Sequence, residues 1–348
     1  MSNSRFVTRP LVTAIGVDIG FGHTKIVAAA QSGETSNAVE RNARFDVITF
    51  PSIVILHRGS LSNGDVLGSS AQDAIHDGEH RYLYGQSAAD GDDGASGRPL
   101  DHTFASSIEY SVLLKASLAK RGYPVTVERL VLGVPFDRLQ TAASTLKSRF
   151  TGTQTVNGHE CDVREVRVVA QPVAGFFWQL HASGRGSVVD KYTCLTCDVG
   201  YRTFDWACTR GLRLIEPRCG SSTGGVSRLV RHISEELSGI CGEDCSTLSM
   251  RSRIEQCLRE RASFIEIGTR RFTMSQFNPT LEKIIDASLL QMVESIGSTT
   301  DITDILVVGG GCDLYLPALI RRFPHKRVLP APEPQFAIAR GLQLLANM

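Results

Sequence analysis

The chain has 348 residues, of which 42% are hydrophobic and 21% are charged, and its formal net charge is +1. This length allows two domains of ordinary size, and the composition is typical of a globular protein in water. A net charge so close to zero gives no indication of direct binding to nucleic acid or to an anionic membrane. No apolar run approaches the length of a bilayer span, and the N-terminal residues lack the apolar core of a signal peptide. We therefore expect a cytoplasmic protein that contacts neither membranes nor nucleic acid directly.

The first half of the chain is predicted to begin with strands and to continue with strands and helices. In chain order we expect two strands joined by a Gly-rich turn in 11–30, a strand in 46–56, a surface loop in 85–99, a helix in 102–121, a strand in 131–134, a helix in 141–150, strands in 161–170 and a helix from 171 to 183. The small and polar residues 181–191 are the best candidate for a domain boundary.

The second half repeats this order. We expect strands in 193–200, 203–210 and 212–217, a glycine turn in 219–225, a helix in 228–239, a helix-rich stretch in 247–297, a strand in 302–311, a helix in 317–323, a strand in 327–330 and a closing helix in 335–347. The repetition predicts two α/β domains that face each other across a cleft, domain I in 1–180 and domain II in 181–348.

Each half opens with a buried strand that ends in an Asp-x-Gly turn. The first turn lies in IGVDIGFGHTK (15–25) and the second in TCDVGYRTFDW (196–206). The first turn runs into another strand rather than a helix, so it is a hairpin and not a P-loop. A carboxylate beside several backbone N–H groups suits a hydrated Mg²⁺ and the phosphate oxygens that the ion bridges. Asp18 and Asp198 could thus share one Mg²⁺–phosphate unit, with Lys25, Arg202 and Thr203 as phosphate donors.

Two further glycine clusters are candidates for turns in which a ligand lies close to the backbone. Gly309, Gly310 and Gly311 end a buried strand, where the absence of side chains lets a flat ring such as adenine approach the backbone. Gly224 and Gly225 open a predicted helix, whose N-terminus could face a ribose and an α-phosphate. An ordinary tight turn is the alternative for each cluster taken alone.

Nine cysteines are scattered along the chain, and their odd number in a long chain favours free thiols over a disulfide framework. Cys194 and Cys197 lie three apart on a predicted strand, so their side chains point to opposite faces. Cys241 and Cys245 lie in a predicted turn and could chelate a metal, but no other CxxC or His pair has a convincing spacing.

The segments VDIGFGHTK, QPVAG, CDVGYRTFD, GSSTGG and VVGGGCD, in this order, resemble the five nucleotide-binding segments of the actin/Hsp70/sugar-kinase superfamily. More closely, with VLGVPFDRL as further support, the chain resembles the ParM/StbA-type plasmid segregation actins, including the actin-like protein D of PRTRC plasmid cassettes. The resemblance implies an α/β, two-domain actin-like (ribonuclease H-like) ATPase fold with an interdomain nucleotide cleft. It also implies a variable subdomain around 33–100 and a closing helix that packs back on domain I.

The resemblance implies a role for each matched residue. Asp18 and Asp198 would hold Mg²⁺ through water, Gln171 would orient the attacking water, and Asp198 would assist proton removal. The phosphate-binding residues would be Asp18, Gly20, Phe21, Gly22, His23, Thr24 and Lys25 in the first loop and Gly200, Tyr201, Arg202, Thr203 and Asp205 in the second. The nucleoside-binding residues would be Gly224, Gly225, Gly309, Gly310 and Gly311.

Four of these positions depart from the pattern of the family. Phe21 and His23 replace small polar residues, and the bulky Tyr201 and Arg202 replace Gly or Ser. Backbone N–H contacts survive such changes, but Phe21 has no side-chain donor. Whether Arg202 supplies charge to the phosphate or points into solvent stays open.

By resemblance, the chain hydrolyses ATP with Mg²⁺, assembles into filaments and acts in plasmid or DNA segregation through an adaptor or a DNA-binding protein. Two alternatives stay open: a nucleotide-dependent scaffold that does not polymerise, and a small-metabolite kinase of the same superfamily. The sequence leaves open the filament geometry, the identity of the adaptor and the choice between ATP and GTP.

Overall fold

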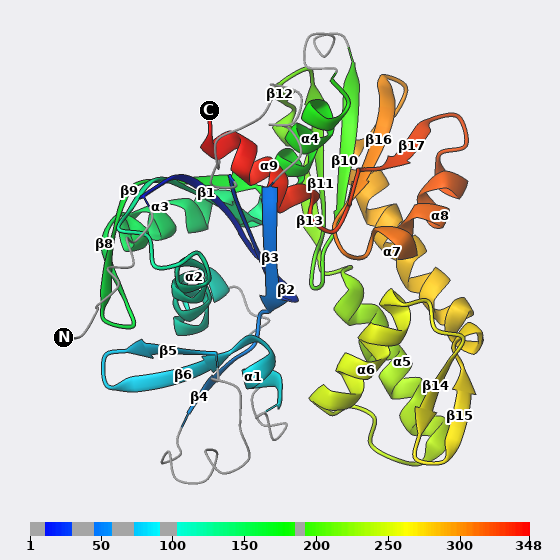
Figure 1. The fold of residues 1–348 in the computed structure, drawn as a ribbon. Coiled ribbons are helices and arrows are strands. Elements are labelled where there is room, and N and C mark those ends of the chain that lie inside the picture. The colour runs from blue at the N-terminus through cyan, green and yellow to red at the C-terminus, as the bar shows by residue number, and fades with distance from the viewer. Residues whose placement is uncertain (1–10, 30–44, 58–72, 91–102, 185–191) are drawn as a thin grey trace, which may run out of the picture.

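The computed structural model describes residues 11–29, 45–57, 73–90, 103–184 and 192–348. It contains two mixed β-sheets, one on the left and one on the right of Figure 1, each with helices packed against it. The predicted α/β architecture with two halves is therefore confirmed.

The first sheet has the strand order β3-β2-β1-β7-β9-β8. Its strands are β1 (Leu11–Ile19), β2 (His23–Ala29), β3 (Phe45–Pro51), β7 (Thr126–Val134), β8 (Gly152–Val156) and β9 (His159–Ala170). Strands β1, β7 and β9 are parallel, and the other three are antiparallel to their neighbours. Helices α2 (Ile108–Lys120) and α3 (Leu139–Phe150) cover this sheet, and Ile15, Leu113 and Leu130 lie in the core between them.

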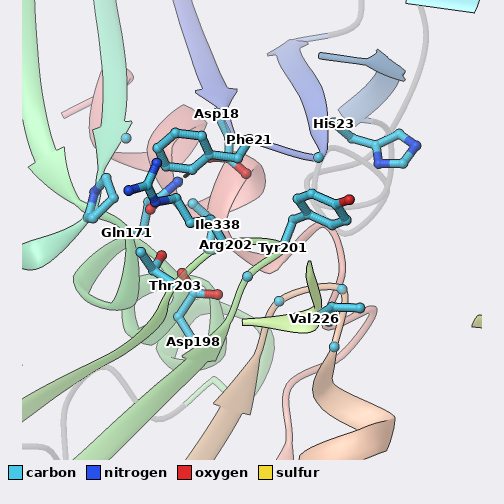
Figure 2. A pocket seen from close by; sticks show the side chains of 18 of the residues that line it. Asp18, Phe21, His23, Gln171, Asp198, Tyr201, Arg202, Thr203, Val226 and Ile338 are labelled. Atoms are coloured by element: carbon cyan, nitrogen blue, oxygen red, sulfur yellow. Dashed lines mark hydrogen bonds between the residues drawn. The ribbon is translucent and has the colours of Figure 1, made fainter. Parts of the chain in front are cut away.

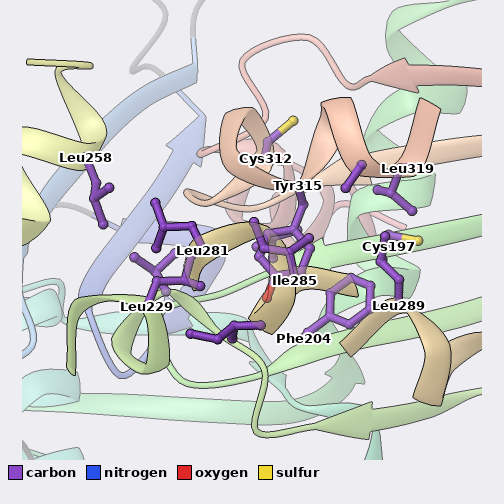
Figure 3. Close-up of a cluster of buried hydrophobic side chains, with 14 of the residues drawn as sticks. Cys197, Phe204, Leu229, Leu258, Leu281, Ile285, Leu289, Cys312, Tyr315 and Leu319 are labelled. Atoms are coloured by element: carbon purple, nitrogen blue, oxygen red, sulfur yellow. The ribbon is translucent and has the colours of Figure 1, made fainter. Parts of the chain in front are cut away.

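The second sheet has the order β12-β11-β10-β16-β17, with β13 added beside β11. Its strands are β10 (Thr193–Val199), β11 (Phe204–Arg210), β12 (Arg213–Leu214), β13 (Gly220–Ser222), β16 (Ile302–Val308) and β17 (Arg327–Pro330). The helices that build its core are α5 (Val226–Cys241), α7 (Asn278–Ile296) and α8 (Cys312–Arg322). Figure 3 shows this core, where Phe204, Leu289 and Leu319 are fully or almost fully buried. Burial of each such side chain contributes roughly 1.5–3 kcal/mol.

Both halves start with the same unit of three strands. Strand β1 lies between its antiparallel hairpin partner β2 and the parallel strand β7. Strand β10 lies in the same way between β11 and β16. The internal duplication predicted from the two Asp-x-Gly turns is therefore confirmed, and it brings each turn to the same end of its sheet.

Helices α4 (Gln171–Ala182) and α9 (Ala337–Ala346) pack together between the two sheets (Figure 1). They approach so closely at Gly341 that a Cβ there would collide with the carbonyl group of Ala174. Gln343 of α9 is fully buried, and its Oε1 accepts a hydrogen bond from the backbone N–H of Gly16 at 2.7 Å. The closing helix thus packs on β1, while the domain boundaries at 180/181 stay a prediction.

Each half carries a smaller addition. In the first half, β4 (Val54–Leu56), β5 (Ala74–Asp77) and β6 (His80–Tyr84) form a three-stranded sheet beside the short helix α1 (Gly85–Asp90). In the second half, helix α6 (Leu248–Arg259) is followed by the hairpin of β14 (Phe264–Ile267) and β15 (Arg270–Thr273). Among the helices of the described ranges, none combines the length and the apolar character needed to cross a membrane.

Several predicted elements were wrong in detail. The predicted strand 46–56 is broken between β3 and β4, and the loop predicted in 85–99 begins with helix α1, while 91–99 lie outside the described residues. The predicted strand 212–217 ends at Leu214, because Pro217 lies in a 3-10 turn. The predicted helix 317–323 begins earlier, at Cys312, and contains Pro317.

The helix-rich stretch 247–297 contains the β14–β15 hairpin, which the sequence prediction missed. Ile265 and Ile267 are buried, whereas Glu266 between them is exposed, and this alternation is typical of a strand. Gly268 turns the chain with φ +58°, a conformation that glycine adopts without strain.

Candidate functional site

A cleft of about 850 Å³ lies where β1 and β10 end, and its volume is in the range of pockets that bind small molecules. Both halves line it. The first half contributes the β1–β2 turn, residues 103–106 and the start of α4, and the second contributes the β10–β11 turn, residues 309–314 and residues 333–336. Figure 2 shows Asp18 and Phe21 of the first half facing Asp198 and Thr203 of the second.

Asp18, the penultimate residue of β1, is neutralised within its own half. Its side chain is almost completely buried, and its Oδ2 accepts a hydrogen bond from Lys25 Nζ at 3.1 Å. Its Oδ1 accepts a second one from Gln171 Nε2 at 2.7 Å. Lys25 lies opposite Asp18 in the β1–β2 register, and Gln171 begins α4 directly after β9. The first turn therefore holds its carboxylate in a complete set of partners.

Asp198, the penultimate residue of β10, has an acidic partner instead. Asp205 lies opposite Asp198 in the β10–β11 register, and both carboxylates are buried. Burial raises the pKa of Asp198 well above its usual range, and the nearby charges of Asp205 and Asp18 raise this pKa further. Within the described residues, Asp198 Oδ1 has no hydrogen-bond partner.

Asp205 links the second turn to the first half. Its Oδ1 accepts a hydrogen bond from the backbone N–H of Phe136 at 3.1 Å, just after β7. Burial raises the pKa of Asp205 to about 6. Its carboxylate therefore joins the two halves rather than facing the cleft.

The two turns have the same backbone hydrogen bond. The N–H of Gly20 donates to the carbonyl of His23 at 3.2 Å, and the N–H of Gly200 donates to that of Thr203 at 2.9 Å. Positions 18, 20, 23 and 25 thus correspond to 198, 200, 203 and 205. The similarity between residues 15–25 and 196–206 therefore reflects a structural repeat, in which the backbone is the same and the side chains differ.

The turns also touch each other across the cleft. A Cβ at Gly22 would lie only 2.8 Å from Cβ of Tyr201, so the tyrosine packs directly on the glycine. The guanidinium carbon of Arg202 lies 5.0 Å from the ring centroid of Phe21 (Figure 2). Residue 21 of one turn thus meets residue 202 of the other, and residue 22 meets residue 201. The four residues form an approximately two-fold contact.

The N-terminus of α5 holds the second turn in place. The N–H groups of Gly225 and Ser227 donate to the carbonyls of Arg202 and Tyr201, at 3.0 and 2.6 Å. Gly224 packs beneath them, where its carbonyl accepts a hydrogen bond from the hydroxyl of Tyr315. These N–H groups are therefore occupied by hydrogen bonds within the protein. A nucleoside contact by Gly224 and Gly225 stays a prediction, and the packing of α5 on the second turn is another reason for glycine at these positions.

The cleft brings together most of the residues predicted for the site. Those that line it are Asp18, Gly20, Phe21, Gly22, His23, Lys25, Gln171, Asp198, Gly200, Tyr201, Arg202, Thr203, Gly309, Gly310 and Gly311. Four predicted residues, Thr24, Asp205, Gly224 and Gly225, are not among the lining residues. The hydroxyl of Thr24 is buried against Ser52 Oγ at 2.9 Å, because alternate residues of β2 point to opposite faces.

Gly309, Gly310 and Gly311, which follow β16, differ in the atoms that surround them. A Cβ at Gly309, where φ is +91°, would collide with Asp198 Oδ1 and lie 2.5 Å from the carbonyl oxygen of Val199. Gly311 is equally crowded, since its N–H donates to the Val199 carbonyl at 2.9 Å. A Cβ at Gly310 would meet nothing within 4 Å. Two of the three glycines therefore let β16 and the second turn pack closely, and Gly310 leaves backbone accessible.

Gly133 and Tyr110 are among the lining residues of the cleft that sequence reasoning missed. Gly133 of β7 lies so close that an added Cβ would be 3.2 Å from Gln171 Cγ and 3.6 Å from Asp18 Oδ1. A glycine inside a strand often marks such an approach, so the signal was present in the sequence. Tyr110 of α2 is buried, and its hydroxyl has no hydrogen-bond partner in the part of the chain that the structure describes. An aromatic residue on an apolar helix face is typical of core, and nothing in the sequence separates Tyr110 from it.

The second turn fits a hydrated Mg²⁺ better than the first. Asp198 lines the cleft, and its Oδ1 is a buried oxygen without a hydrogen-bond partner in the described ranges. Carboxylate oxygens are the donors that Mg²⁺ prefers. In those same ranges, no group of three or more His, Cys, Asp or Glu side chains surrounds one point. Cys241 and Cys245 lie with their sulfurs 3.6 Å apart, and whether they bind a metal stays open.

Comparison with known proteins matches both halves. A family model described as actin like proteins, N-terminal domain, matches residues 16–173. A second one, described as archaeal actin homologue MreB-like, C-terminal, matches residues 196–320. No curated protein sequence matches the chain significantly.

Solved structures of actin homologues have the same fold over almost the whole chain. The native archaeal actin homolog Ta0583 aligns with a TM-score of 0.75 and 16% identity, over 97% of this chain and 99% of that one. Its complex with ADP aligns with a TM-score of 0.73 and 17% identity, over the same 97% and 99%. A ParM from a 15-stranded filament of Clostridium botulinum aligns with a TM-score of 0.70 and 14% identity, over 97% and 99%. The chain thus has an actin-like fold throughout, and each of its halves matches a family model of actin-like proteins.

Proposed function

We propose that this chain is a Mg²⁺-dependent ATPase that binds ATP in the cleft between its two halves. The observation that carries the proposal is the pair of matched Asp turns, Asp18 to Lys25 and Asp198 to Asp205, which end on opposite sides of one cleft. The ADP complex of the archaeal actin homolog supports it, because that protein shares the fold.

The phosphates would lie between the two turns. Backbone N–H groups of a tight turn form an anion-binding concavity, and Lys25 adds a positive charge beside the first turn. Asp198 would hold Mg²⁺ through water, with Asp18 on the other side of the cleft. Mg²⁺ held there would supply positive charge that neutralises the negative charge of the phosphates. The adenosine would lie toward Gly310, where the backbone is open.

Gln171 is placed to orient the attacking water. Its Nε2 is held by Asp18 Oδ1 at 2.7 Å, so that its Oε1 is available to accept a hydrogen bond from a water in the cleft. Asp198, whose pKa is raised by burial, would accept the proton that this water loses. Most of the rate enhancement would come from positioning and charge neutralisation.

Replacement of Gln171 tests this role. Phosphate release from Mg-ATP by Gln171→Ala should fall about 10²-fold, while ATP affinity changes little, because the side chain acts on the water rather than on the nucleotide. Gln154→Ala, in strand β8 outside the cleft, is the matched control and should turn over like the wild type. An unchanged rate in Gln171→Ala, with ATP still bound, would remove Gln171 from the mechanism.

We further propose that the chain assembles into filaments when ATP is bound, and that it acts in plasmid or DNA segregation through an adaptor or DNA-binding protein. The filament structure of a ParM with the same fold supports self-association. Closure of the cleft changes the relative orientation of the two halves and therefore of their surfaces. A head-to-tail contact between copies that does not close into a ring gives a filament.

ATP-dependent light scattering and pelleting, followed by electron microscopy, test the assembly. ATP turnover without any pelleted polymer would favour the scaffold, and turnover that requires an added acceptor would favour a kinase.

A further inference from the structure

The two turns meet through Phe21, Tyr201 and Arg202, three residues that depart from the family pattern. The ring of Phe21 is fixed on its own half, because it stacks on Phe104 at a centroid distance of 4.8 Å. Phe104 in turn packs against Tyr110 at 5.5 Å. The guanidinium of Arg202, which comes from the second half, lies over this ring of the first half.

The backbone of Arg202 is fixed, so its side chain is the part that can change partner. The carbonyls of Arg202 and Tyr201 accept hydrogen bonds from the first turn of α5, and a Cβ at Gly225 would collide with this backbone. The planar guanidinium therefore projects from a rigid base into the cleft that the Asp turns line (Figure 2). It lies within reach of the ring of Phe21 and of the space proposed for the phosphates.

The ring of Phe21 and a phosphate attract this guanidinium with different strengths. Contact with an aromatic ring is a weak attraction, whereas a guanidinium and a phosphate form charge-assisted hydrogen bonds that are often bidentate. Lys25, the other cation of the turns, is already paired with Asp18. When a terminal phosphate enters between the turns, the guanidinium of Arg202 would therefore leave the ring of Phe21 and bind the phosphate. When the phosphate leaves, the guanidinium would return to the ring.

We propose that Arg202 distinguishes a nucleoside triphosphate from a diphosphate by exchanging the ring of Phe21 for the terminal phosphate. Because the ring belongs to one half and Arg202 to the other, the exchange breaks a contact between the halves and links nucleotide state to their relative position. This inference rests on the proposed function, since it assumes that the cleft holds the nucleotide.

Competition for one guanidinium predicts opposite effects for its two partners. Without the ring, the phosphate no longer competes with Phe21 for the guanidinium, so Phe21→Leu should raise the affinity ratio of triphosphate over diphosphate. Without the guanidinium, the triphosphate loses its extra contact, so Arg202→Gln should lower the same ratio. The double variant should behave like Arg202→Gln, because the ring then has no guanidinium to hold.

The experiment is calorimetric titration of the full chain with Mg-ADP and with the Mg²⁺ complex of the β,γ-imido analogue of ATP. We expect Arg202→Gln to lower the analogue-to-ADP affinity ratio about tenfold and Phe21→Leu to raise it roughly threefold. Arg202→Lys, which keeps the charge but loses the planar fork, should fall between the wild type and Arg202→Gln. The matched control is Arg271→Gln, which removes an arginine from the ring of Phe264 in the β14–β15 hairpin, outside the cleft, and should leave the ratio unchanged.

An unchanged ratio in both Arg202→Gln and Arg202→Lys would overturn the inference, as would a lowered ratio in Phe21→Leu. Both outcomes leave the proposed function intact as long as the wild type binds nucleotide. Failure of the wild type to bind either nucleotide would instead contradict the proposed function itself.

Discussion

The two Asp turns share a backbone and differ in charge. In the first turn, Asp18 lies opposite Lys25 and is held by it and by Gln171. In the second, Asp198 lies opposite Asp205, and one oxygen of Asp198 has no hydrogen-bond partner among the described residues. In the first turn, the charge of the Asp carboxylate is neutralised by a lysine of the same turn, so this turn is suited to holding Gln171 in place. The second turn has two carboxylates, so it is suited to binding a cation.

The largest expected difference between the turns concerns the glycine that packs against each Asp. Gly309→Ala should cost about 2–4 kcal/mol in the free energy of unfolding, because its Cβ would collide with Asp198 and with backbone of Val199, at a positive φ. Gly133→Ala should cost about 1 kcal/mol, because the atoms near its Cβ belong to the side chains of Leu342, Gln171 and Asp18, which can shift. Urea unfolding of both variants measures the difference.

Gly310→Ala is the control for this pair, because its Cβ would enter open space and its stability should stay within about 0.5 kcal/mol of the wild type. Equal losses in Gly309→Ala and Gly133→Ala would show that the second turn is no more tightly packed than the first.

The difference in charge predicts stability changes of opposite sign. Asp18→Asn should destabilise the nucleotide-free protein by about 1–3 kcal/mol, because it leaves the partly buried Lys25 without its counter-charge. Asp198→Asn should stabilise it, because burial and the nearby Asp205 both disfavour the charged form of Asp198. Thermal unfolding at pH 8 measures both, and two changes of the same sign would contradict the division of charge.

The pH dependence of stability follows from the same raised pKa values. The pKa of Asp205 is about 6 in the folded protein, against about 3.8 for an ordinary Asp, so the folded state keeps a proton that the unfolded chain releases. This contribution is present below about pH 4 and is lost as the pH rises through about 6, on the order of 3 kcal/mol in total. In the double variant Asp198→Asn/Asp205→Asn, the decline in the unfolding free energy between about pH 4 and pH 7 should largely disappear.

Much of the fold could be predicted from local sequence. The apolar strands before Asp18 and Asp198, the glycines after them, and Pro172 at the start of α4 each fix their own segment. A segment could not be assigned where a short alternation of buried and exposed residues competes with a helical pattern. Residues Ile265 to Phe272, which form the β14–β15 hairpin, were missed for this reason. Cys194 and Cys197 do face separate cores, as their spacing on a strand predicts.

The site was predictable only in part, since its contacts join residues far apart in the chain. The sequence indicated the Asp turns because each lies at the end of a strand, and it indicated Gln171 only through the resemblance to the actin superfamily. It could not show that Tyr201 packs on Gly22 or that Arg202 lies over Phe21, because both contacts depend on how the two halves face each other. Nor could it show that α5 uses its N-terminal N–H groups to hold the second turn.

Whether Asp198 holds Mg²⁺ in the cleft is tested by the effect of Mg²⁺ on ATP affinity in the wild type and in Asp198→Asn, with the exposed Asp286→Asn on α7 as the control. Equilibrium titrations with Mg²⁺ and with EDTA should show that Mg²⁺ tightens ATP binding at least about tenfold in the wild type and in the control. Asp198→Asn should lose most of this difference. If Asp198→Asn keeps the full effect of Mg²⁺, or if the wild type shows none, then the second turn does not hold the cation.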